Sequence, residues 1–564
     1  MRWNLAREPK PEKVAHLSKV LNVSPTISKL LLNRGIETYQ QARTFFRPNL
    51  AELHNPFLMK NMDLAVQRIE NAMKSNENIM IYGDYDVDGT TSVSLIYSYL
   101  KKIYPNLTTY IPNRYTEGYG ISYQGIDFAN DNDITLIIAL DCGIKAIDKV
   151  KYAKEKGIDF IICDHHRPGN KIPDAVAILN PKQDSCSYPY KELCGCGIAF
   201  KLVQAIHQKR ELDFKEIIPY LDLVATAIAA DIVPINGENR ILAYFGLQVI
   251  NKNPRIGIKA LLSSVKKEKI TITDVVFVVA PRINAAGRIK SGNAAVTLLI
   301  EDDLEAAAEF AKAIENYNIE RKDLDKRIAK EALQQIKDNN EEDRFTTVVY
   351  NENWHKGVIG IVASRLIEKH YRPTLVFTKS GDFLAASARS VKGFDVYEAL
   401  EKSSEFIEQF GGHKYAAGLT LKPENYEKFK AKFEQVVKES ISNELLIPEI
   451  KIDAEIHLTE ITPKLNRIIK QFAPFGPQNM KPVFATNGVR DNGYGKPVGS
   501  DKSHIKLNLI AGTHFKTFPA IGFGLAKKFE QLPKGKGFDI AYTIDENHWN
   551  GNVTLQLVLK DLKG

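Results

Sequence analysis

The stretch Ile79-Met80-Ile81-Tyr82-Gly83-Asp84-Tyr85-Asp86-Val87-Asp88-Gly89 decides how the rest of this chain is organised. Its apolar, Ile-rich first half predicts a buried β-strand, and the segment from Thr90 to Lys101 is compatible with a helix. Asp84, Asp86 and Asp88 lie between the two, and carboxylates this close together repel one another wherever they are partly buried. The triplet is therefore either a solvated turn or a cation site, and these residues by themselves leave both open.

Two later apolar runs end in the same kind of residue. The run from Ile134 to Leu140 precedes Asp141-Cys142-Gly143, and the run from Gly157 to Cys163 precedes Asp164-His165-His166. In an open parallel sheet the carboxyl ends of the strands face one crevice, so acids that end three successive strands converge on one place. This convergence favours the cation site, since no single motif is specific on its own.

The patterns along the chain predict several domains. Strands and helices alternate from about residue 61 to 235, which predicts a doubly wound α/β domain with a parallel sheet. Glu301 to Asn340 is a long charged helix pattern of the kind that bridges domains. A smaller α/β domain follows from residue 344, and short alternating strands beyond residue 445 favour a small β-barrel such as an OB-fold.

Composition limits the class of protein. At 564 residues, with 44% hydrophobic and 26% charged residues, the chain is typical of a soluble protein with more than one core. It has neither a membrane-spanning apolar run nor a signal peptide, so we expect a cytoplasmic protein without a membrane partner. The net charge of +8 favours a polyanionic partner. Five cysteines argue against a disulfide framework, and Cys186, Cys194 and Cys196 lack the fourth ligand of a metal knuckle.

The motifs resemble those of the DHH phosphoesterase superfamily, and the fuller pattern resembles its branch of single-strand-specific exonucleases. The superfamily motifs are Gly83 to Gly89, Asp141-Cys142-Gly143, Asp164-His165-His166 and Ala230-Asp231-Ile232-Val233-Pro234. The stretches similar to the exonuclease branch are Leu53 to Met59, Pro112 to Gly120, Pro281 to Arg288 and Phe410 to Gly418. The resemblance spans almost the whole chain and implies five segments: an N-terminal helical segment (1–60), a DHH catalytic domain (61–240), a helical region with a long connecting helix (241–343), a DHHA1 domain (344–442) and an OB-fold nucleic-acid-binding domain (446–564). For the helical segment at 1–60, the default interpretation is a packing collar for the catalytic domain.

The resemblance implies a site that holds two Mn²⁺ or Mg²⁺ ions. Its predicted metal ligands, all catalytic, are Asp84, Asp86, Asp88, Asp141, His165 and Asp231, and His166 is a further catalytic residue beside the scissile phosphate. Carboxylates with one imidazole suit these hard or borderline cations. Asp164 is a candidate to orient an imidazole, and Asp222, near the start of a helical pattern, is interpreted as structural.

The resemblance also implies substrate contacts. The predicted anchor of a terminal phosphate consists of Arg114, Ser387 and Arg389. A Gly-containing turn nearer the strand's path is predicted to contain Arg282, Asn284 and Arg288. Close approach to an anion is predicted for Gly411, Gly412 and His413. In the predicted barrel, candidates for a single-strand groove are Lys502, Lys506, Lys516, Lys527, Lys528, Lys534, Lys536, Phe515, Phe518 and Phe529, although scattered lysines on a barrel are commonplace.

The implied activity is metal-dependent hydrolysis of single-stranded DNA from its 5′ end, which releases mononucleotides during DNA repair and recombination. Candidate partners besides single-stranded DNA are a helicase and a single-strand-binding protein. The main alternative is a phosphodiesterase of the same superfamily that acts on short oligonucleotides or cyclic dinucleotides, and a catalytically inactive DNA-binding scaffold is a second one. All the expected ligands are present, which disfavours the scaffold.

Overall fold

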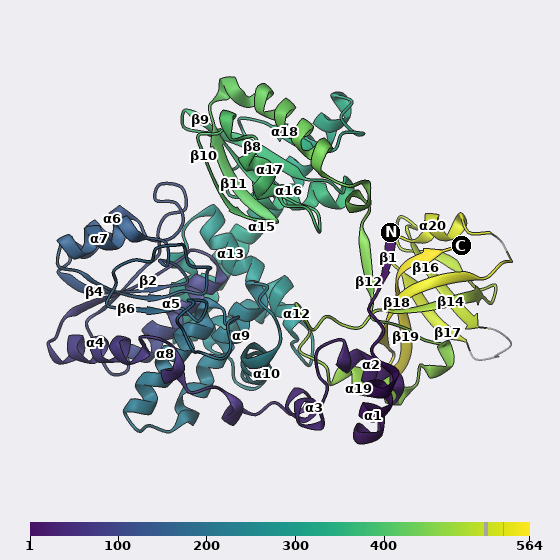
Figure 1. The fold of residues 1–564 in the computed structure, drawn as a ribbon, viewed down its shortest axis with the longest axis horizontal. Helices are drawn as coiled ribbons and strands as arrows, with labels where there is room; N and C mark the ends of the chain where they lie inside the picture. The colour runs from purple at the N-terminus through teal and green to yellow at the C-terminus, as the bar shows by residue number, and fades with distance from the viewer. Residues whose placement is uncertain (512–516, 534) are drawn as a thin grey trace.

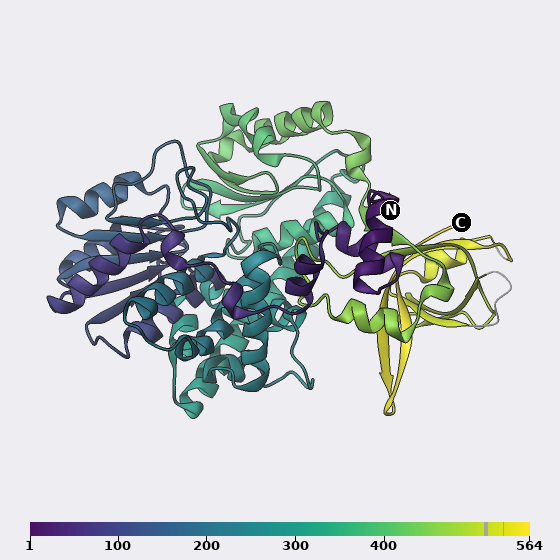
Figure 2. The same cartoon turned by 60° about the horizontal axis from the view of Figure 1, so that its bottom comes forward.

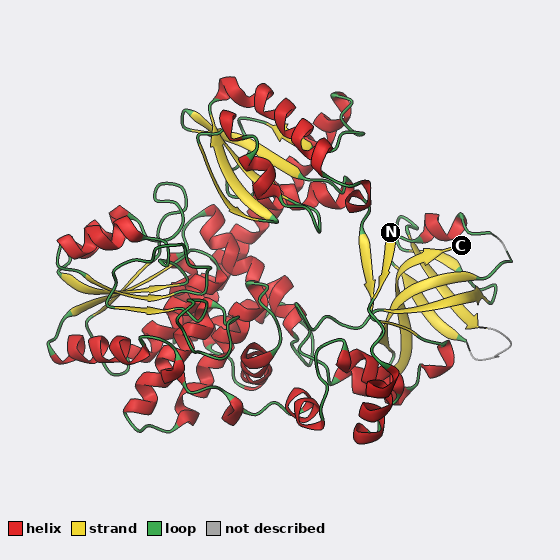
Figure 3. Cartoon of the chain, in the orientation of Figure 1, coloured by secondary structure: helices red, strands yellow, loops and turns green. Residues whose placement is uncertain are grey.

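The chain folds into two α/β domains and a C-terminal barrel, with a long helix between the α/β domains (Figure 1). This computed structural model describes residues 1–511, 517–533 and 535–564. Figure 3 shows that helices dominate the middle of the chain, whereas the barrel is built mostly of strands. Within the described residues, no helix combines the length and the apolar character needed to cross a membrane.

The first α/β domain contains a sheet of five parallel strands in the order β3-β2-β4-β5-β6. Its elements are η1 (Leu50–Glu52), η2 (Pro56–Leu58), α4 (Met62–Lys74), β2 (Asn78–Gly83), α5 (Val87–Leu100), β3 (Leu107–Tyr110), α6 (Tyr123–Asp131), β4 (Ile134–Leu140), α7 (Ile147–Glu155), β5 (Asp159–Cys163), β6 (Ala177–Leu179), α8 (Gly195–Lys209), η3 (Phe214–Tyr220) and α9 (Leu221–Ala230). The chain runs outward in opposite directions from β2, so a topological switch point lies between β2 and β4, where ligands bind in such sheets.

Both faces of this sheet are buried, which explains why its strands are apolar at nearly every position. Ile79 and Ile81 of β2 pack in the same core as α4, α5 and α8. Met80 and Tyr82, which alternate with them, pack on the opposite side in the same core as α6 and α7. The predicted doubly wound domain is therefore confirmed.

A helical region and a long helix follow. Their elements are α10 (Gly237–Lys252), α11 (Ile256–Leu262), α12 (Ile272–Asp274), the π-helix η4 (Val275–Val279), α13 (Ala280–Ile289), α14 (Asn293–Ile300) and α15 (Leu304–Asp338). The predicted turn around Arg282, Asn284 and Arg288 is wrong, because these residues lie in α13. Gly287 is needed there for close packing, since a Cβ at this position would lie 2.5 Å from the carbonyl oxygen of Tyr85.

The second α/β domain has a mixed sheet in the order β10-β11-β9-β8-β7, parallel only between β7 and β8. Its elements are β7 (Thr347–Tyr350), α16 (Ile359–Lys369), β8 (Thr374–Ser380), β9 (Phe383–Arg389), α17 (Val396–Glu401), η5 (Ser404–Phe406), β10 (Gln409–His413), β11 (Ala416–Leu421), η6 (Pro423–Asn425), α18 (Tyr426–Ser440) and η7 (Asn443–Leu446). The C-terminal half of α15 shares a core with α16, which attaches this domain to the connecting helix.

The C-terminal barrel closes through a pairing of β14 with β16 in addition to the order β13-β14-β18-β19-β17-β16-β15. Its elements are β12 (Glu449–Ile452), β13 (Ala454–Glu455), η8 (Leu458–Glu460), α19 (Pro463–Lys470), β14 (Phe484–Asp491), β15 (Lys496–Val498), β16 (His504–Ala511), β17 (Phe518–Gly522), α20 (Ala526–Glu530), β18 (Phe538–Trp549) and β19 (Asn552–Lys563). A closed barrel of short strands with a helix before the last hairpin fits the predicted OB-fold.

The predicted groove on this barrel is wrong in part. Phe518 is buried in the barrel core, and Phe529 packs against the same core, so neither ring offers a free stacking face. Lys528 forms an ion pair with the buried Asp561, 2.5 Å away. The predicted Phe515, Lys516 and Lys534 lie outside the described residues.

The N-terminal segment contains β1 (Arg2–Leu5), α1 (Pro11–Leu21), α2 (Pro25–Leu32) and α3 (Tyr39–Phe46). The collar interpretation is wrong, because Leu17, Ile27 and Leu31 share a core with Phe472 and the barrel strands. Strand β1 pairs with β12 at the entrance to the barrel. Figure 2 shows these helices against the barrel, at the opposite end of the molecule from the parallel sheet.

Candidate active site

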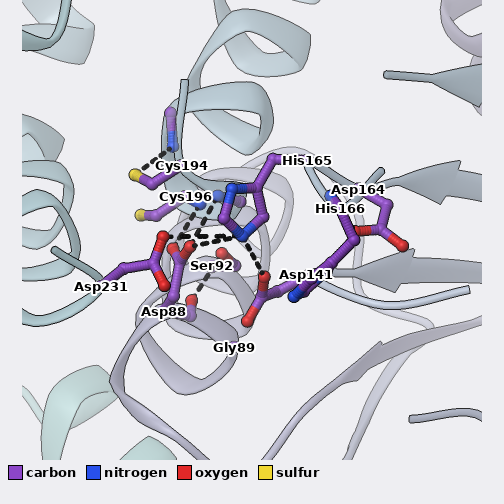
Figure 4. A network of polar contacts seen from close by, with 12 residues as sticks. Asp88, Gly89, Ser92, Asp141, Asp164, His165, His166, Cys194, Cys196 and Asp231 are labelled. Atoms are coloured by element: carbon purple, nitrogen blue, oxygen red, sulfur yellow. Dashed lines mark hydrogen bonds and ion pairs between the residues drawn. The ribbon is translucent and has the colours of Figure 1, made fainter. Parts of the chain in front are cut away.

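The carboxyl ends of β2, β4 and β5 meet at the switch point, and four predicted ligands converge there (Figure 4). The Nε2 atom of His165 lies 3.2 Å from Asp141 Oδ1, 3.5 Å from Asp231 Oδ2 and 3.7 Å from Asp88 Oδ2. Asp231 reaches the site from the end of α9, far along the chain from the strands. We call Asp88, Asp141, His165 and Asp231 the central cluster.

Glycines allow the backbone to pack closely around this cluster. A Cβ at Gly89 would lie 2.4 Å from the carbonyl oxygen of Asp84, and one at Gly195 would lie 2.8 Å from Asp141 Cβ. Asp141 itself has a left-handed backbone with φ of 59°, which is uncommon for a residue with a side chain and often marks a functional site. The local sequence thus accepts an unfavourable backbone conformation at Asp141, and the glycines allow a tight arrangement of carboxylates.

The N-terminus of α8 holds Asp88. The backbone N–H of Gly195 donates to Asp88 Oδ2 at 2.6 Å, and that of Cys196 donates to Oδ1 at 2.7 Å. A helix N-terminus carries unpaired N–H groups and a partial positive charge, so it stabilises a carboxylate in this place. The sequence interpretation missed this contact, although the short Gly-Cys-Gly stretch at a helix start is a signal for it.

Burial and mutual repulsion disfavour the charged forms of these acids. Burial, then the charge of Asp86, raise the pKa of Asp88 to about 7. Burial, then the charges of Asp88 and Asp86, raise the pKa of Asp231 to about 9. The pKa values of Asp84 and Asp141 are also raised, chiefly by burial. A group of acids in this state gains free energy from any cation that it binds.

The pKa values of the two neighbouring histidines are shifted in opposite directions. Burial, then the charge of His166, lower the pKa of His165 to about 3, so this imidazole is neutral and suited to ligate a metal. His166 faces Asp164, whose Oδ1 lies 2.7 Å from His166 Nδ1. Burial lowers the pKa of His166, but the Asp164 contact outweighs it and leaves the pKa raised. Asp164 therefore orients His166 and favours its cationic form.

The donor set fits divalent cations. Asp84 is 1% exposed, and neither of its carboxylate oxygens has a hydrogen bond of normal geometry to a described residue. The same holds for Asp141 Oδ1, Asp231 Oδ2 and both ring nitrogens of His165. Buried polar atoms are normally hydrogen-bonded, so buried carboxylate and imidazole atoms that gather around one point without hydrogen bonds of normal geometry are suited to bind a cation. Two groups have ligand atoms within 4.8 Å of one another, Asp88 with His165 and Asp231, and Asp141 with His165 and His166.

The remaining acids take other positions. Asp86 is half-buried, caps the N-terminus of α5 and accepts the N–H of Gly89 at 3.0 Å. It lies beside the central cluster, because its charge helps to raise the pKa values of Asp84, Asp88 and Asp231. Asp222 instead binds Arg255 through an ion pair of 3.0 Å, which agrees with a structural role.

The sequence interpretation assigned no role to Tyr119 or Lys182. The Tyr119 hydroxyl lies 3.3 Å from His166 Nε2 and 3.4 Å from the carbonyl oxygen of Asp141. The charge of Lys182 adds to the larger effect of burial in lowering the pKa of His165, and it offsets a small part of the burial-driven rise in the pKa of Asp231. Both residues therefore border the site, and Tyr119 was recognisable only as part of the stretch that follows Arg114.

A second group of residues brings cationic side chains of the first α/β domain and the helical region close to those of the second α/β domain. Ser387 and Arg389 lie on β9, and Arg389 Nη1 donates to Ser387 Oγ at 3.0 Å. A Cβ at Gly360 would lie 2.9 Å from Ser387 Oγ, so the first turn of α16 directly adjoins this pair. Arg114 and Arg288 approach from the first domain and the helical region. We call Arg114, Arg288, Ser387 and Arg389 the cationic pocket.

The charges in the cationic pocket repel one another. Burial, then Arg114 and Arg389, lower the pKa of Arg288 to about 10. Burial, then Arg114, lower the pKa of Arg389. Arg114 lies over the ring of Tyr85, 4.7 Å from its centroid, next to the acidic motif. Clustered guanidinium groups beside a helix N-terminus suit an anion with several oxygens, such as a phosphate.

The other predicted substrate residues are divided between the helical region and the second α/β domain. Arg282 is held by an ion pair with Glu315 of α15 at 2.5 Å, and Asn284 is half-buried on the same helix α13. Gly411, Gly412 and His413 lie in β10. Burial, then the charges of Lys145, His166 and Lys182 of the first domain, lower the pKa of His413, so His413 lies near basic residues of that domain.

Known proteins match this chain along its full length. Family models match residues 78–228 (DHH family, N-terminal domain), 343–439 (DHHA1 domain) and 452–561 (RecJ OB domain). The single-stranded-DNA-specific exonuclease RecJ of Bacillus subtilis is 36% identical over 566 residues, which cover 100% of this chain and 70% of that protein. RecJ of Escherichia coli K12 is 30% identical, with 95% of this chain and 96% of that protein covered.

Solved structures agree with these matches. The crystal structure of RecJ from Thermus thermophilus in complex with Mn²⁺ has a TM-score of 0.85 at 25% identity and covers 100% of this chain and 79% of that one. A structure of exonuclease RecJ bound to manganese has a TM-score of 0.61 at 29% identity, with 70% and 97% covered. These matches confirm the predicted DHH, DHHA1 and OB-fold architecture. With 36% identity to a relative that it covers to 70%, 30% identity to one that it covers to 96%, and three matching domain models, the chain belongs to the RecJ family.

Proposed function

We propose that this chain is a metal-dependent exonuclease that hydrolyses single-stranded DNA from the 5′ end and releases mononucleotides, in DNA repair and recombination. The observation that carries the proposal is the combination of unpaired acidic and imidazole groups in the central cluster with a cationic pocket between the two α/β domains. Its RecJ relatives are named as single-stranded-DNA-specific exonucleases.

The metal ligands in this proposal are Asp84, Asp86, Asp88, Asp141, His165 and Asp231, which would hold Mn²⁺ or Mg²⁺. Two such ions supply a water of lowered pKa and stabilise charge on the phosphodiester. The protein contributes the arrangement: Asp88 is held by the α8 amides, and His165 stays neutral because burial lowers its pKa. His166, held by Asp164, would present to the phosphate a ring whose cationic form the Asp164 contact favours.

The cationic pocket supports the proposal that the enzyme acts at the 5′ end of a DNA strand. Arg114, Ser387 and Arg389 would bind the terminal 5′-phosphate, with Arg288 beside them. A terminal phosphate carries more charge than an internal one, so several partly buried guanidinium groups favour it. When this phosphate is held, the next phosphodiester along the strand is the one offered to the central cluster, and a mononucleotide leaves.

The barrel supports a long single-stranded substrate. OB-folds bind oligonucleotides, and this one is attached to both ends of the catalytic region through β1, β12 and the N-terminal helices. A phosphodiesterase for short oligonucleotides or cyclic dinucleotides needs neither the barrel nor α15. That alternative is not favoured by the relatives, which are exonucleases over the same full length.

The proposal is tested by digestion of 5′-labelled and 3′-labelled single strands, with duplex and a dinucleotide as comparison substrates, in Mn²⁺, Mg²⁺ and chelator. We expect metal-dependent release of labelled mononucleotide from the 5′ end first, and little turnover of duplex. Faster turnover of the dinucleotide than of the long strand would instead favour the alternative activity.

Two variants separate the chemical step from end recognition. Asp141→Ala should abolish hydrolysis and leave DNA binding nearly intact, because the residue lies among metal ligands and not in the strand's path. Arg389→Ala should reduce the preference for 5′-phosphorylated over 5′-hydroxyl strands by about tenfold, the value of one charge-assisted contact of about 1.5 kcal/mol. An active Asp141→Ala enzyme or an unchanged 5′ preference would refute the respective assignment.

The cellular setting is proposed on sequence grounds. We propose that the enzyme acts in the cytoplasm, where a helicase exposes single strands and a single-strand-binding protein covers them. Co-purification of either protein with the full chain, and its stimulation of digestion of a duplex with a short 5′ single strand, would test these partners.

A further inference from the structure

The loop that follows the metal ligand Asp231 has a conformation that its own sequence disfavours. Ile232 has a left-handed backbone with φ of 61° and is 73% exposed, which is unusual for a β-branched apolar residue. Such a conformation persists only where the surrounding structure fixes it. We call residues 232–237 the ligand loop, because it continues directly from Asp231.

The first α/β domain and the start of α10 hold one side of the ligand loop. The Tyr190 hydroxyl donates to Asn236 Oδ1 at 2.8 Å, and Asn239 Nδ2 donates to the carbonyl oxygen of Pro234 at 3.1 Å. These contacts fix the far end of the loop beside α10. They leave Ile235 and the amide group of Asn236 free to contact another part of the chain.

The barrel holds the other side. The N–H of Ile235 donates to the carbonyl oxygen of Pro477 at 2.8 Å, and Asn236 Nδ2 donates to Gln478 Oε1 at 2.6 Å. A Cβ at Gly476 would lie 2.5 Å from Ile235 Cγ1, so the close packing of the Ile235 side chain against this position requires glycine there. We call residues 474–479 the barrel tongue.

The barrel tongue is itself rigidly held. Asn479 Nδ2 donates to the carbonyl oxygens of Phe472 and Pro474 at 2.8 and 2.9 Å, and Arg34 Nε donates to Asn479 Oδ1 at 3.0 Å. The buried Arg240 of α10 donates to the carbonyl oxygens of Phe472 and Ala473 at 2.7 and 3.1 Å. The tongue is thus a preorganised surface and not a flexible loop tip.

We propose that the barrel tongue is a positioning element for the metal centre, in which Gly476, Pro477 and Gln478 fix the ligand loop and thereby the carboxylate of Asp231. The OB-fold domain then contributes to metal affinity as well as to DNA binding. This inference rests on the proposed metal site, since it needs Asp231 to be a ligand. Partners outside the ligand shell commonly change metal affinity by about tenfold when they are removed.

The test measures Mn²⁺ binding directly, by the electron paramagnetic resonance signal of free Mn²⁺ titrated into the full chain without DNA. Gly476→Ala forces its Cβ against Ile235 and should weaken Mn²⁺ binding by about tenfold. Gln478→Ala removes the acceptor of Asn236 and should weaken it by about threefold, whereas Gln478→Glu keeps an acceptor oxygen and should bind as the wild type does. The double variant Gly476→Ala with Ile235→Ala removes the clashing Cγ1 and should recover part of the loss.

Two controls make the result decisive. Asn487 on the barrel hydrogen-bonds Glu455 at 2.6 Å and lies outside the tongue, so Asn487→Ala should leave Mn²⁺ binding unchanged. Asp231→Asn should weaken it strongly. If Asp231→Asn weakens Mn²⁺ binding but neither Gly476→Ala nor Gln478→Ala does, or if Asn487→Ala weakens it equally, the tongue proposal is overturned and the metal site stands. If Asp231→Asn binds Mn²⁺ as the wild type does, the metal site and the tongue proposal both fall.

Discussion

Replacing one of the proposed metal ligands should stabilise the metal-free protein and destabilise it relative to wild type once metal is added. Asp231 shows this most clearly, because its pKa rises from the usual 3.8 to about 9 through burial and the charges of Asp88 and Asp86. Asp231→Asn keeps the shape of the side chain and removes the charge. The cost of that charge in the absence of metal can be estimated from the shift.

A raised pKa means that the folded state binds protons more tightly than the unfolded state. Stability is therefore lost as the pH rises from about 4 toward about 9. Each pH unit above 3.8 lowers the free energy of unfolding by about 1.36 kcal/mol, so the full shift corresponds to a loss of about 4 kcal/mol at pH 7. The side chain is 23% exposed and its titration depends on that of two other acids, Asp88 and Asp86, so we halve this to about 2 kcal/mol.

In chelator at pH 7, Asp231→Asn should thus be more stable than the wild type by about 2 kcal/mol, and at pH 5 by less than about 1 kcal/mol. Mn²⁺ at 100 times its dissociation constant stabilises the wild type by about 2.7 kcal/mol. Because the variant lacks a ligand, we expect it to gain less than the difference of about 0.7 kcal/mol, and the order of stability should then reverse. Asp131→Asn, an exposed site on α6, is the matched control and should show neither effect.

Hydrogen exchange of peptides from β2, β4 and α9 is the suitable assay, because it reports the opening free energy of the first α/β domain separately from the barrel. Exchange is measured at pH 5 and 7, with correction for intrinsic rates, in chelator and in Mn²⁺. A variant that is less protected than the wild type in chelator at pH 7, or a difference that does not depend on pH, would refute the account of the site as a cluster of uncompensated acids.

Two further outcomes test the surroundings of the site. Arg240→Lys should destabilise the junction between α10 and the barrel by about 3 kcal/mol, because lysine cannot donate to all the carbonyl oxygens that the buried guanidinium group contacts. Faster limited proteolysis near residues 471–480 would show this loss, and unchanged cleavage would contradict it. Asp164→Asn should lower the pKa of His166, because the Asp164 carboxylate raises it in the wild type. The alkaline limb of the pH profile of single-strand digestion should therefore move to lower pH. An unchanged limb would show that His166 does not take part in the reaction.

Short-range sequence patterns were enough to predict much of the fold and of the proposed metal site. The Ile-rich run before Asp84 had to be a buried parallel strand, because its apolar residues leave neither face for solvent, and the observed β2 packs on both sides. Acids that follow successive parallel strands share an edge by geometry, which is why Asp141 and His165 could be expected together. The long charged pattern of α15 likewise needed no tertiary information.

Contacts between segments that are distant in the sequence could not be predicted from such short-range patterns. The helix that holds Asp88 begins at Gly195, more than a hundred residues later, and only packing of α8 against α5 brings its amides to the carboxylate. The N-terminal helices were expected on the catalytic domain, yet they share the core of the barrel, because an amphipathic face indicates that a helix is buried but does not say against what.

The sequence alone therefore determined which elements form and which side chains can hold a cation or a phosphate, since both depend on local periodicity and chemical type. Only the tertiary structure decided which of those groups meet: the cationic pocket across two domains, Phe518 turned into the barrel core, and the tongue against the ligand loop. The physical reason is that burial and pairing are set by the neighbours a residue acquires on folding, and those neighbours come from anywhere along the chain.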